Sequence, residues 1–200
     1  MAEKQGAAGL EDVIAAAKAA QDETPKKRGL PPVHLWNPPH CGEIDIFIRK
    51  DGVWFHEGTP IGREALVRLF STVLRKDPDG IHLVTPVEKM KIRVEDAPFV
   101  AVRVDQVLGD DGQSVLRFLT NVGDEVEAGP DNAIRVEMGE GGEPRPYLHV
   151  RRGLEALIAR PVFYELVELA RERETDAGPT LGVSSHGAWY PVGPAGAHRL

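Results

Sequence analysis

The chain has 200 residues with a formal net charge of −7; hydrophobic residues make up 42% and charged residues 28%. This composition supports one or two folded domains and excludes a chain that is disordered throughout. An acidic chain repels a phosphate backbone, so we expect no binding to a nucleic acid polymer, although a few arginines can still hold a small anionic ligand.

The N-terminal segment predicts a short helix without a targeting signal. Residues 1–9 lack the basic stretch and apolar run of a signal peptide, and the chain has no run of about 18 apolar residues that would span a membrane. Apolar side chains repeat at helical spacing over residues 10–20, around Val13 and Ile14. The stripe is rich in alanine and too small for a membrane anchor, so we expect a cytoplasmic protein.

Residues 21–42 predict a linker, because two proline pairs favour extended backbone. Trp36 is expected to pin this segment by packing its ring. His34, His40 and Cys41 offer metal-ligating atoms, but the prolines separate them and a fourth ligand is missing. Cys41 is also the only cysteine, which excludes an internal disulfide. We therefore predict no metal site and no cofactor.

The next segment predicts a hairpin and a helix. Alternating apolar residues flank Asp51-Gly52, a strong signal for a tight β-turn. A helix is expected over residues 63–75, with an apolar face made by Leu66, Phe70, Val73 and Leu74. Pro78 and Gly80 are helix breakers, so the first domain is predicted to cover residues 1–79.

Residues 80–200 predict a second, β-rich domain. Apolar residues recur with period two in several short segments, which indicates an antiparallel sheet, and a helix is expected over residues 161–174. The sequence thus predicts an α+β protein of two small domains, each with an antiparallel sheet and one main helix. Ile61-Gly-Arg63 and Ile158-Ala-Arg160 both precede an expected helix, so an internal duplication is expected.

Motifs for catalysis are weak throughout the chain. Gly139–Gly142 lacks the lysine and helix of a phosphate-binding loop. Ser184, Ser185 and His186 are adjacent, and adjacent residues rarely form a nucleophile–base pair. We predict no catalytic residues.

A more suggestive group consists of Thr85, Glu88, Arg63 and Arg160. Arginines at the starts of two helices can grip a carboxylate or phosphate, with help from the helix amides. The alternative is that both arginines simply pair with acids such as Glu64 or Glu88.

The sequence also resembles a bacterial family, the domain of unknown function 1285. The resemblance covers about residues 30–190. Its matching pieces are Trp36-Asn-Pro38, Ile44-Asp-Ile46, Asp51-Gly-Val-Trp54, Gly58-Thr-Pro-Ile-Gly-Arg63, Leu69-Phe70, Leu83-Val-Thr-Pro-Val-Glu88, Asp96-Ala-Pro-Phe99, Thr120-Asn121, Tyr147-Leu-His-Val-Arg151 and Leu154 to Arg160.

The resemblance implies two similar α+β halves, the second like a pleckstrin-homology barrel, and a ligand cleft between them with a role in signal transduction. The first hypothesis is a sensing module that binds a small anionic, nucleotide-like ligand through Arg63, Thr85, Glu88 and Arg160, joined by the residues Arg151 and Asn121. The second is an enzyme on a nucleotide-like metabolite, with Glu88 or His149 as its base. The third is an adaptor that binds a protein partner through the Pro31–Pro39 segment or an exposed apolar patch, without a small-molecule ligand.

Overall fold

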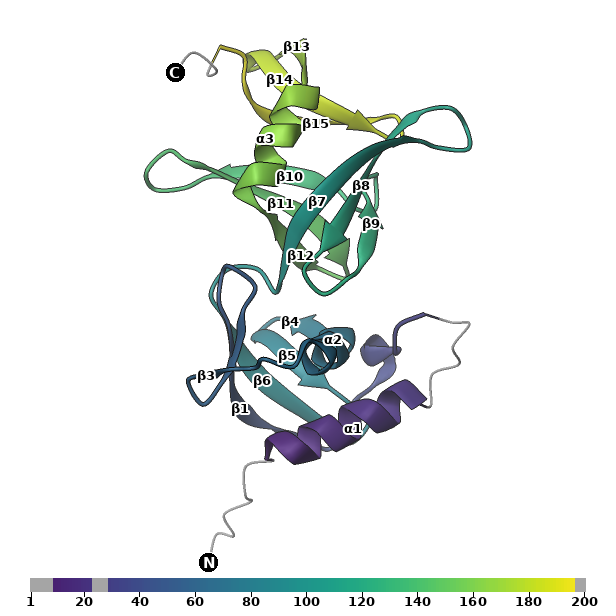
Figure 1. Ribbon diagram of the computed structural model, residues 1–200, viewed down its shortest axis with the longest axis vertical. Coiled ribbons are helices and arrows are strands. Elements are labelled where there is room, and N and C mark those ends of the chain that lie inside the picture. The colour runs from purple at the N-terminus through teal and green to yellow at the C-terminus, as the bar shows by residue number, and fades with distance from the viewer. Residues whose placement is uncertain (1–8, 23–28, 197–200) are drawn as a thin grey trace, which may run out of the picture. The chain divides into compact units, whose positions relative to one another are not determined.

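The computed structural model describes residues 9–22 and 29–196 of the chain. It divides into two compact units, Met1–Asp96 and Ala97–Leu200 (Figure 1). Both combine sheets with helices, so the α+β class is confirmed. The predicted antiparallel sheets are each mixed instead, because one pair of strands in each main sheet is parallel. Within the described residues, no helix is long and apolar enough to cross a membrane.

The first unit contains one six-stranded sheet and two α-helices. The strand order is β3-β2-β1-β6-β5-β4, with only the neighbours β1 and β6 parallel. The elements in chain order are α1 (Leu10–Asp22), the 3-10 turn η1 (Val33–Leu35), β1 (His40–Ile48), β2 (Trp54–His56), β3 (Thr59–Pro60), α2 (Glu64–Thr72), β4 (Leu74–Asp77), β5 (Gly80–Val84) and β6 (Glu88–Val94).

The core of the first unit forms where one face of the sheet meets α2. Ile46 and Ile48 of β1 are fully buried, and the Trp54 ring stacks on Phe70 of α2 with 6.2 Å between ring centroids. The predicted turn at Asp51-Gly52 joins β1 to β2, and Gly52 adopts a φ of 84°, which suits glycine. The hairpin prediction is therefore confirmed.

The predicted helix over residues 63–75 is shorter in the structure, because α2 ends at Thr72. The hydroxyl groups of Ser71 and Thr72 donate back to carbonyl oxygens in the last turn. Leu74 then pairs with Leu83 as the first residue of β4. Its apolar side chain fits a helix stripe and a strand equally well, so periodicity could not separate the two.

The second unit has a six-stranded sheet, one helix and a three-stranded sheet. The larger sheet has the order β10-β11-β12-β7-β8-β9, with β7 and β12 parallel, and the smaller one has the order β13-β14-β15. The elements are β7 (Phe99–Leu108), β8 (Ser114–Thr120), β9 (Glu125–Glu127), β10 (Ile134–Met138), β11 (Pro144–Arg151), β12 (Leu154–Ile158), α3 (Arg160–Leu169), β13 (Arg171–Thr175), β14 (Gly178–Ser185) and β15 (Ala188–Pro194).

The helix predicted over residues 161–174 is confirmed only in its first part, since α3 ends at Leu169. Arg171–Thr175 pairs with β14 as strand β13, with Arg171 opposite Gly182. This segment alternates charged residues and has no apolar stripe. The apolar stripe thus ends at Ala170, and the predicted helix was extended beyond it over charged residues that fit a helix surface and an exposed strand alike.

The division between the units corrects the predicted boundary at residue 79. Pro78 and Asp79 form the turn of the β4–β5 hairpin, where Asp77 pairs with Gly80, and β5 and β6 complete the first sheet. The units separate only after β6, between Asp96 and Ala97. Turn residues mark a tight hairpin as well as a linker, so composition alone placed the boundary too early.

The two six-stranded sheets share one topology. If the strands of each sheet are numbered one to six along the chain, both sheets have the order three-two-one-six-five-four, and strands one and six are parallel. The helices differ in position: α2 follows the third strand of its unit, whereas α3 follows the sixth. The Ile-x-Arg segments that precede these helices are therefore not equivalent positions.

Candidate functional site

Glu88, the first residue of β6, is a nearly buried carboxyl group in the first unit. It is 9% exposed, and its Oε1 atom has no hydrogen-bond partner among the described residues. Burial is the main cause that raises the pKa of Glu88; Asp12 of α1 raises it further, and His40 acts in the opposite direction. Buried polar atoms are almost always paired, so this carboxyl group is a candidate functional residue.

Thr85 holds the turn that positions Glu88. The Glu88 backbone N–H donates to Thr85 Oγ1 at 3.2 Å, and the Thr85 N–H donates to the Glu88 carbonyl at 2.9 Å. Thr85 is 1% exposed. The structure thus brings two predicted site residues together, with Thr85 fixing the backbone of Glu88.

Arg63 is the N-cap residue of α2 and is exposed. Its side chain makes no hydrogen bond or ion pair with a described residue, and Glu64 instead pairs with Arg68 at 3.7 Å. A backbone hydrogen bond two residues earlier shows where Arg63 lies. The Ile61 N–H donates to the Trp54 carbonyl, and Trp54 lies opposite Ile48 of β1.

Arg63 and Glu88 lie toward opposite ends of β6. Ile48, beside the Arg63 segment, opposes Val94 at the end of β6, whereas Glu88 is its first residue. Six residues of strand separate the two ends, roughly 20 Å at about 3.3 Å per residue. The two side chains therefore do not converge within the first unit.

The predicted residues of the second unit gather around the start of β7. Asn121 exchanges two hydrogen bonds with the backbone of Val100, at 2.8 and 3.0 Å. Arg151 donates to Asp124 at 2.5 Å, and its guanidinium lies 4.8 Å from the centre of the Phe99 ring. Asn121 and Arg151 thus stabilise the fold through internal contacts.

Arg160, the first residue of α3, lies near the same stretch. The preceding residue, Ala159, donates its N–H to the Ala101 carbonyl at 3.0 Å. Arg160 is exposed, and its side chain makes no hydrogen bond or ion pair with the described part of the chain. Of Asn121, Arg151 and Arg160, Arg160 is the residue whose charge is available to a ligand.

His149 is occupied by structural hydrogen bonds. Its Nδ1 lies 2.7 Å from the Asp131 carbonyl, which can only accept, and the Gly153 N–H donates to its Nε2 at 3.0 Å. Both ring nitrogens of the neutral imidazole are therefore used. Of the two predicted bases, Glu88 is the one without such partners.

Ser185 and His186 do not form a nucleophile–base pair. Ser185 is fully buried, donates to the Ala128 carbonyl at 2.6 Å and accepts from the Leu116 N–H at 2.9 Å. His186 points its Nε2 at Glu127, 2.9 Å away. The serine hydroxyl joins β14 to the larger sheet and serves the fold.

A cluster of charged residues on β4, β5 and β6 was missed by the sequence analysis. Asp77 accepts hydrogen bonds from Arg75 at 2.7 and 2.9 Å and from Lys89 at 3.2 Å. The Arg75 contact, with help from Lys89, lowers the pKa of Asp77 to about 2. Arg75 also donates to the carbonyls of Val33 and Trp36, at 3.0 and 2.8 Å, and so fixes the proline-rich segment.

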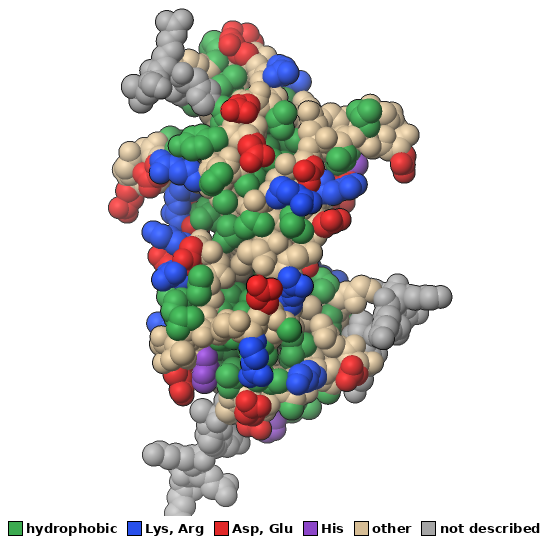
Figure 2. All heavy atoms as spheres, viewed as in Figure 1, with side chains coloured by type: hydrophobic (Ala, Val, Ile, Leu, Met, Phe, Trp, Pro, Cys, Tyr) green, Lys and Arg blue, Asp and Glu red, His purple; other side chains and the backbone are tan. Residues whose placement is uncertain are grey.

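Elsewhere on the surface, charges of both signs are mixed. Exposed pairs such as Arg93–Asp45 at 2.7 Å and Arg103–Asp105 at 2.9 Å neutralise one another locally. Figure 2 shows basic and acidic side chains interspersed over the visible face.

Comparison with known proteins decides the family. The model of the DUF1285 N-terminal domain matches residues 31–97, and that of the C-terminal domain matches residues 98–192. The chain belongs to the DUF1285 family. The border between these two matches coincides within a residue with the division between the structural units.

A solved structure of a DUF1285 protein agrees with this assignment. A DUF1285 protein from Silicibacter pomeroyi DSS-3 is 47% identical, with a TM-score of 0.80, over 95% of this chain and 97% of that one. A second one, from Shewanella baltica OS155, is 26% identical over 62% of this chain and 90% of that one, with a TM-score of 0.48. No curated protein matches the chain.

Proposed function

We propose that this chain is a ligand-sensing module whose first unit binds a small nucleotide-like molecule through Glu88. The observation that carries the proposal is the unpartnered, buried Oε1 atom of Glu88. A ligand that donates a hydrogen bond to this atom would remove the cost of leaving it unpaired, about 1–3 kcal/mol for a buried polar group. The proposed site lies within one unit and replaces the cleft between halves that the resemblance implied.

The chemistry of Glu88 favours a ligand with an edge like that of a nucleobase. Burial raises the pKa of this carboxyl, which favours its protonated form. A protonated carboxyl donates through its O–H and accepts through its other oxygen, so it complements an amide or amidine edge that accepts and donates side by side. Nucleobases have such edges. His40, opposite Glu88 in the register of β1 and β6, is exposed and is proposed to contact the rest of the ligand.

Access to Glu88 involves helix α1. Asp12, in the first turn of α1, is close enough to act on the Glu88 carboxyl. The buried face of α1 consists of only four residues, Val13, Ile14, Ala17 and Ala20, two of them alanines. A face of this size holds the helix weakly, so its first turn can be displaced. This displacement would expose Glu88 to the ligand, and binding would then change the conformation of the first unit.

The test is a thermal-unfolding panel of nucleosides, nucleotides and free bases on the purified chain. A ligand at a hundred times its dissociation constant adds about 2.7 kcal/mol, which raises the midpoint by roughly 5–10 °C for this chain length. The shift should be lost in Glu88→Leu, which removes both hydrogen-bonding oxygens, and kept in Glu43→Leu, a matched change at an exposed residue of β1. A flat panel, or a shift unchanged by Glu88→Leu, would contradict the proposal. A flat panel would also favour the protein-interaction hypothesis.

An enzyme on a nucleotide-like metabolite is the second candidate. The raised pKa of Glu88 is the specific observation in its favour, because a carboxyl that keeps its proton to a higher pH than usual is better suited to act as a general acid. Turnover of a bound compound, with the rate falling as pH rises through the Glu88 pKa, would support an enzyme. A bound compound that is recovered unchanged after long incubation would support the sensing module.

Two features of the fold also remain proposals. We propose that the two units arose by duplication, supported by the strand order and parallel pair that their sheets share. The likeness of the second unit to a pleckstrin-homology barrel is supported only by its main sheet being followed directly by α3. A cytoplasmic location is part of the same proposal, and the exposed free thiol of Cys41 suits a reducing compartment.

A further inference from the structure

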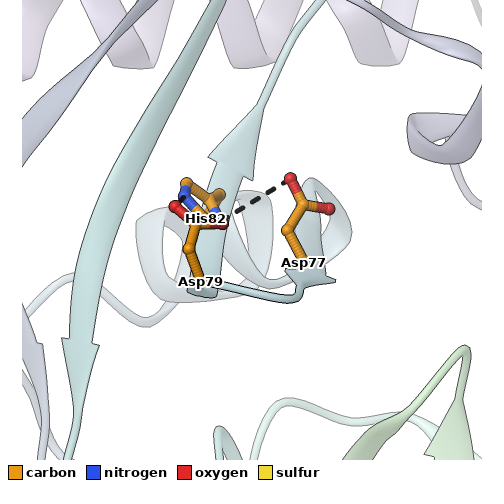
Figure 3. A group of neighbouring side chains, drawn as sticks. All are labelled: Asp77, Asp79 and His82. Atoms are coloured by element: carbon orange, nitrogen blue, oxygen red, sulfur yellow. Dashed lines mark ion pairs between the residues drawn. The ribbon is translucent and has the colours of Figure 1, made fainter.

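The β4–β5 hairpin brings three potential metal ligands together. Asp77 ends β4, Asp79 lies in the turn and His82 is on β5. One ligand atom from each residue lies within 4.8 Å of the others. His82 Nε2 is 3.3 Å from Asp79 Oδ2, and His82 Nδ1 is 3.9 Å from Asp77 Oδ2 (Figure 3).

A second observation concerns the histidine alone. His82 is 2% exposed, yet its Nδ1 has no hydrogen-bond partner among the residues that the structure describes. This nitrogen faces Asp77 at a distance too long for a hydrogen bond. A buried imidazole nitrogen without a partner costs free energy, unless a further group completes the site.

We propose that Asp77, Asp79 and His82 form a binding site for a divalent transition-metal ion such as Zn²⁺. An ion takes one nitrogen of an imidazole, and the unpartnered Nδ1 of His82 is the nitrogen available to it. Nδ1 lies 3.9 Å from Asp77 Oδ2, within the roughly 4.2 Å that two ligands about 2.1 Å from one ion can span. One imidazole nitrogen with two carboxylates suits Zn²⁺ or Mn²⁺ better than Ca²⁺ or Mg²⁺, which prefer oxygen ligands alone. Three protein ligands leave further positions on the ion for water or a ligand.

Lys89 is the competitor of the metal at this site. Its Nζ lies 3.2 Å from Asp77 Oδ2, the same oxygen that faces His82. Arg75 binds both oxygens of Asp77 and, through its contacts with Val33 and Trp36, is held in place. An ion that takes Oδ2 must displace the Lys89 ammonium, while Arg75 keeps the carboxylate oriented.

This site is independent of the ligand site proposed at Glu88. Lys89 and Glu88 are adjacent in β6, so their side chains point to opposite faces of the sheet. Loss of metal binding would leave the Glu88 proposal intact, and the reverse also holds.

The experiment titrates Zn²⁺ into the untagged, full-length chain at neutral pH, in competition with a chromophoric chelator. A Cys41→Ser background removes the exposed thiol, which can bind zinc by itself. We expect one equivalent of Zn²⁺ to bind. Asp79→Asn, a change at a 58% exposed carboxylate that should not affect folding, is expected to weaken binding at least about tenfold.

A second variant changes the affinity in the opposite direction. Lys89→Met removes the competing ammonium, so it should tighten Zn²⁺ binding several-fold, while Asp45→Asn, at an exposed ion pair of the same sheet, should change nothing. Zinc bound equally well by Asp79→Asn and Lys89→Met, or zinc lost entirely with Cys41→Ser, would overturn the proposal. Absence of binding up to about 100 µM would also overturn it, and would leave His82 as a histidine that ion-pairs with two aspartates when protonated.

Discussion

Glu88 and His40 lie opposite each other at the starts of two parallel strands, β6 and β1. Parallel pairing brings the same ends of both strands together, so a buried carboxyl and an exposed imidazole share one edge of the sheet. The Thr85 turn fixes Glu88, and Asp12 adds a negative charge nearby. This arrangement costs stability, which is expected where a residue serves binding or catalysis.

Glu88→Gln should stabilise the chain at neutral pH. The pKa of Glu88 is raised in the folded state, mainly by burial, so ionised Glu88 opposes folding. The penalty is absent below the unfolded pKa and grows as pH rises toward the folded pKa. Thermal unfolding should therefore show a gain for Glu88→Gln over the parent at pH 7 that disappears at acid pH. An equal gain at both values would mean that the carboxyl charge is not its cause.

Asp77→Asn should destabilise the first unit in a pH-dependent way. The pKa of Asp77 is lowered to about 2 from 3.8, first by its hydrogen bonds with Arg75 and then by Lys89. A shift of that size is worth about 2 kcal/mol at neutral pH, and this contribution disappears as pH falls from about 4 to 2. Urea unfolding at pH 7 and pH 3 measures the difference. Asp105→Asn, at an exposed pair with Arg103, should cost less than about 0.5 kcal/mol.

Ser185→Ala should destabilise the second unit by about 1–3 kcal/mol, because the buried Leu116 N–H and Ala128 carbonyl would both lose their partner. The neighbouring Ser184 is exposed, so Ser184→Ala is the matched control and should have almost no effect. Chemical denaturation of the three proteins makes the comparison. Equal effects of the two substitutions would contradict the structural role of Ser185.

Gly182→Ala should also destabilise the second unit, by about 1–3 kcal/mol. A Cβ atom at Gly182 of β14 would overlap the indole ring of Trp189 in β15, which covers the glycine. A Cβ atom added at Gly193, in β15, would have open space around it, so Gly193→Ala provides a control on the same small sheet. A lower unfolding midpoint and altered Trp189 fluorescence are expected for Gly182→Ala alone.

Local turn chemistry allowed much of the fold to be predicted. Asp51-Gly52 encodes a tight turn in the sequence itself, and the structure has it there. Pro78 and Gly80 were equally visible, but a break in the chain looks the same whether it ends a domain or a hairpin. Only the long-range pairing of β5 with β6 shows that the first sheet continues past residue 79.

The structure brings only some of the predicted site residues together, for similar reasons. Thr85 and Glu88 are close in sequence, and a turn joins them. Arg63 could reach Glu88 only through the tertiary fold, and the register of β1 and β6 places the two residues toward opposite ends of β6. The cluster of Asp77, Asp79 and His82 has a local signal in Asp-Pro-Asp-Gly-Ile-His, where a hairpin turn folds the histidine back onto the aspartates. The signal was missed because the same residues were interpreted as a helix stop.

The most direct test of the Glu88 site follows the Glu88 carboxyl carbon by NMR in a pH titration, without and with the compound that gives the largest thermal shift. Glu88→Gln identifies the resonance. The account predicts that Glu88 titrates above the exposed glutamates in the free chain, and that the compound moves this midpoint further than that of any other glutamate. A Glu88 midpoint within the range of the exposed glutamates, and unmoved by every compound of the panel, would contradict it.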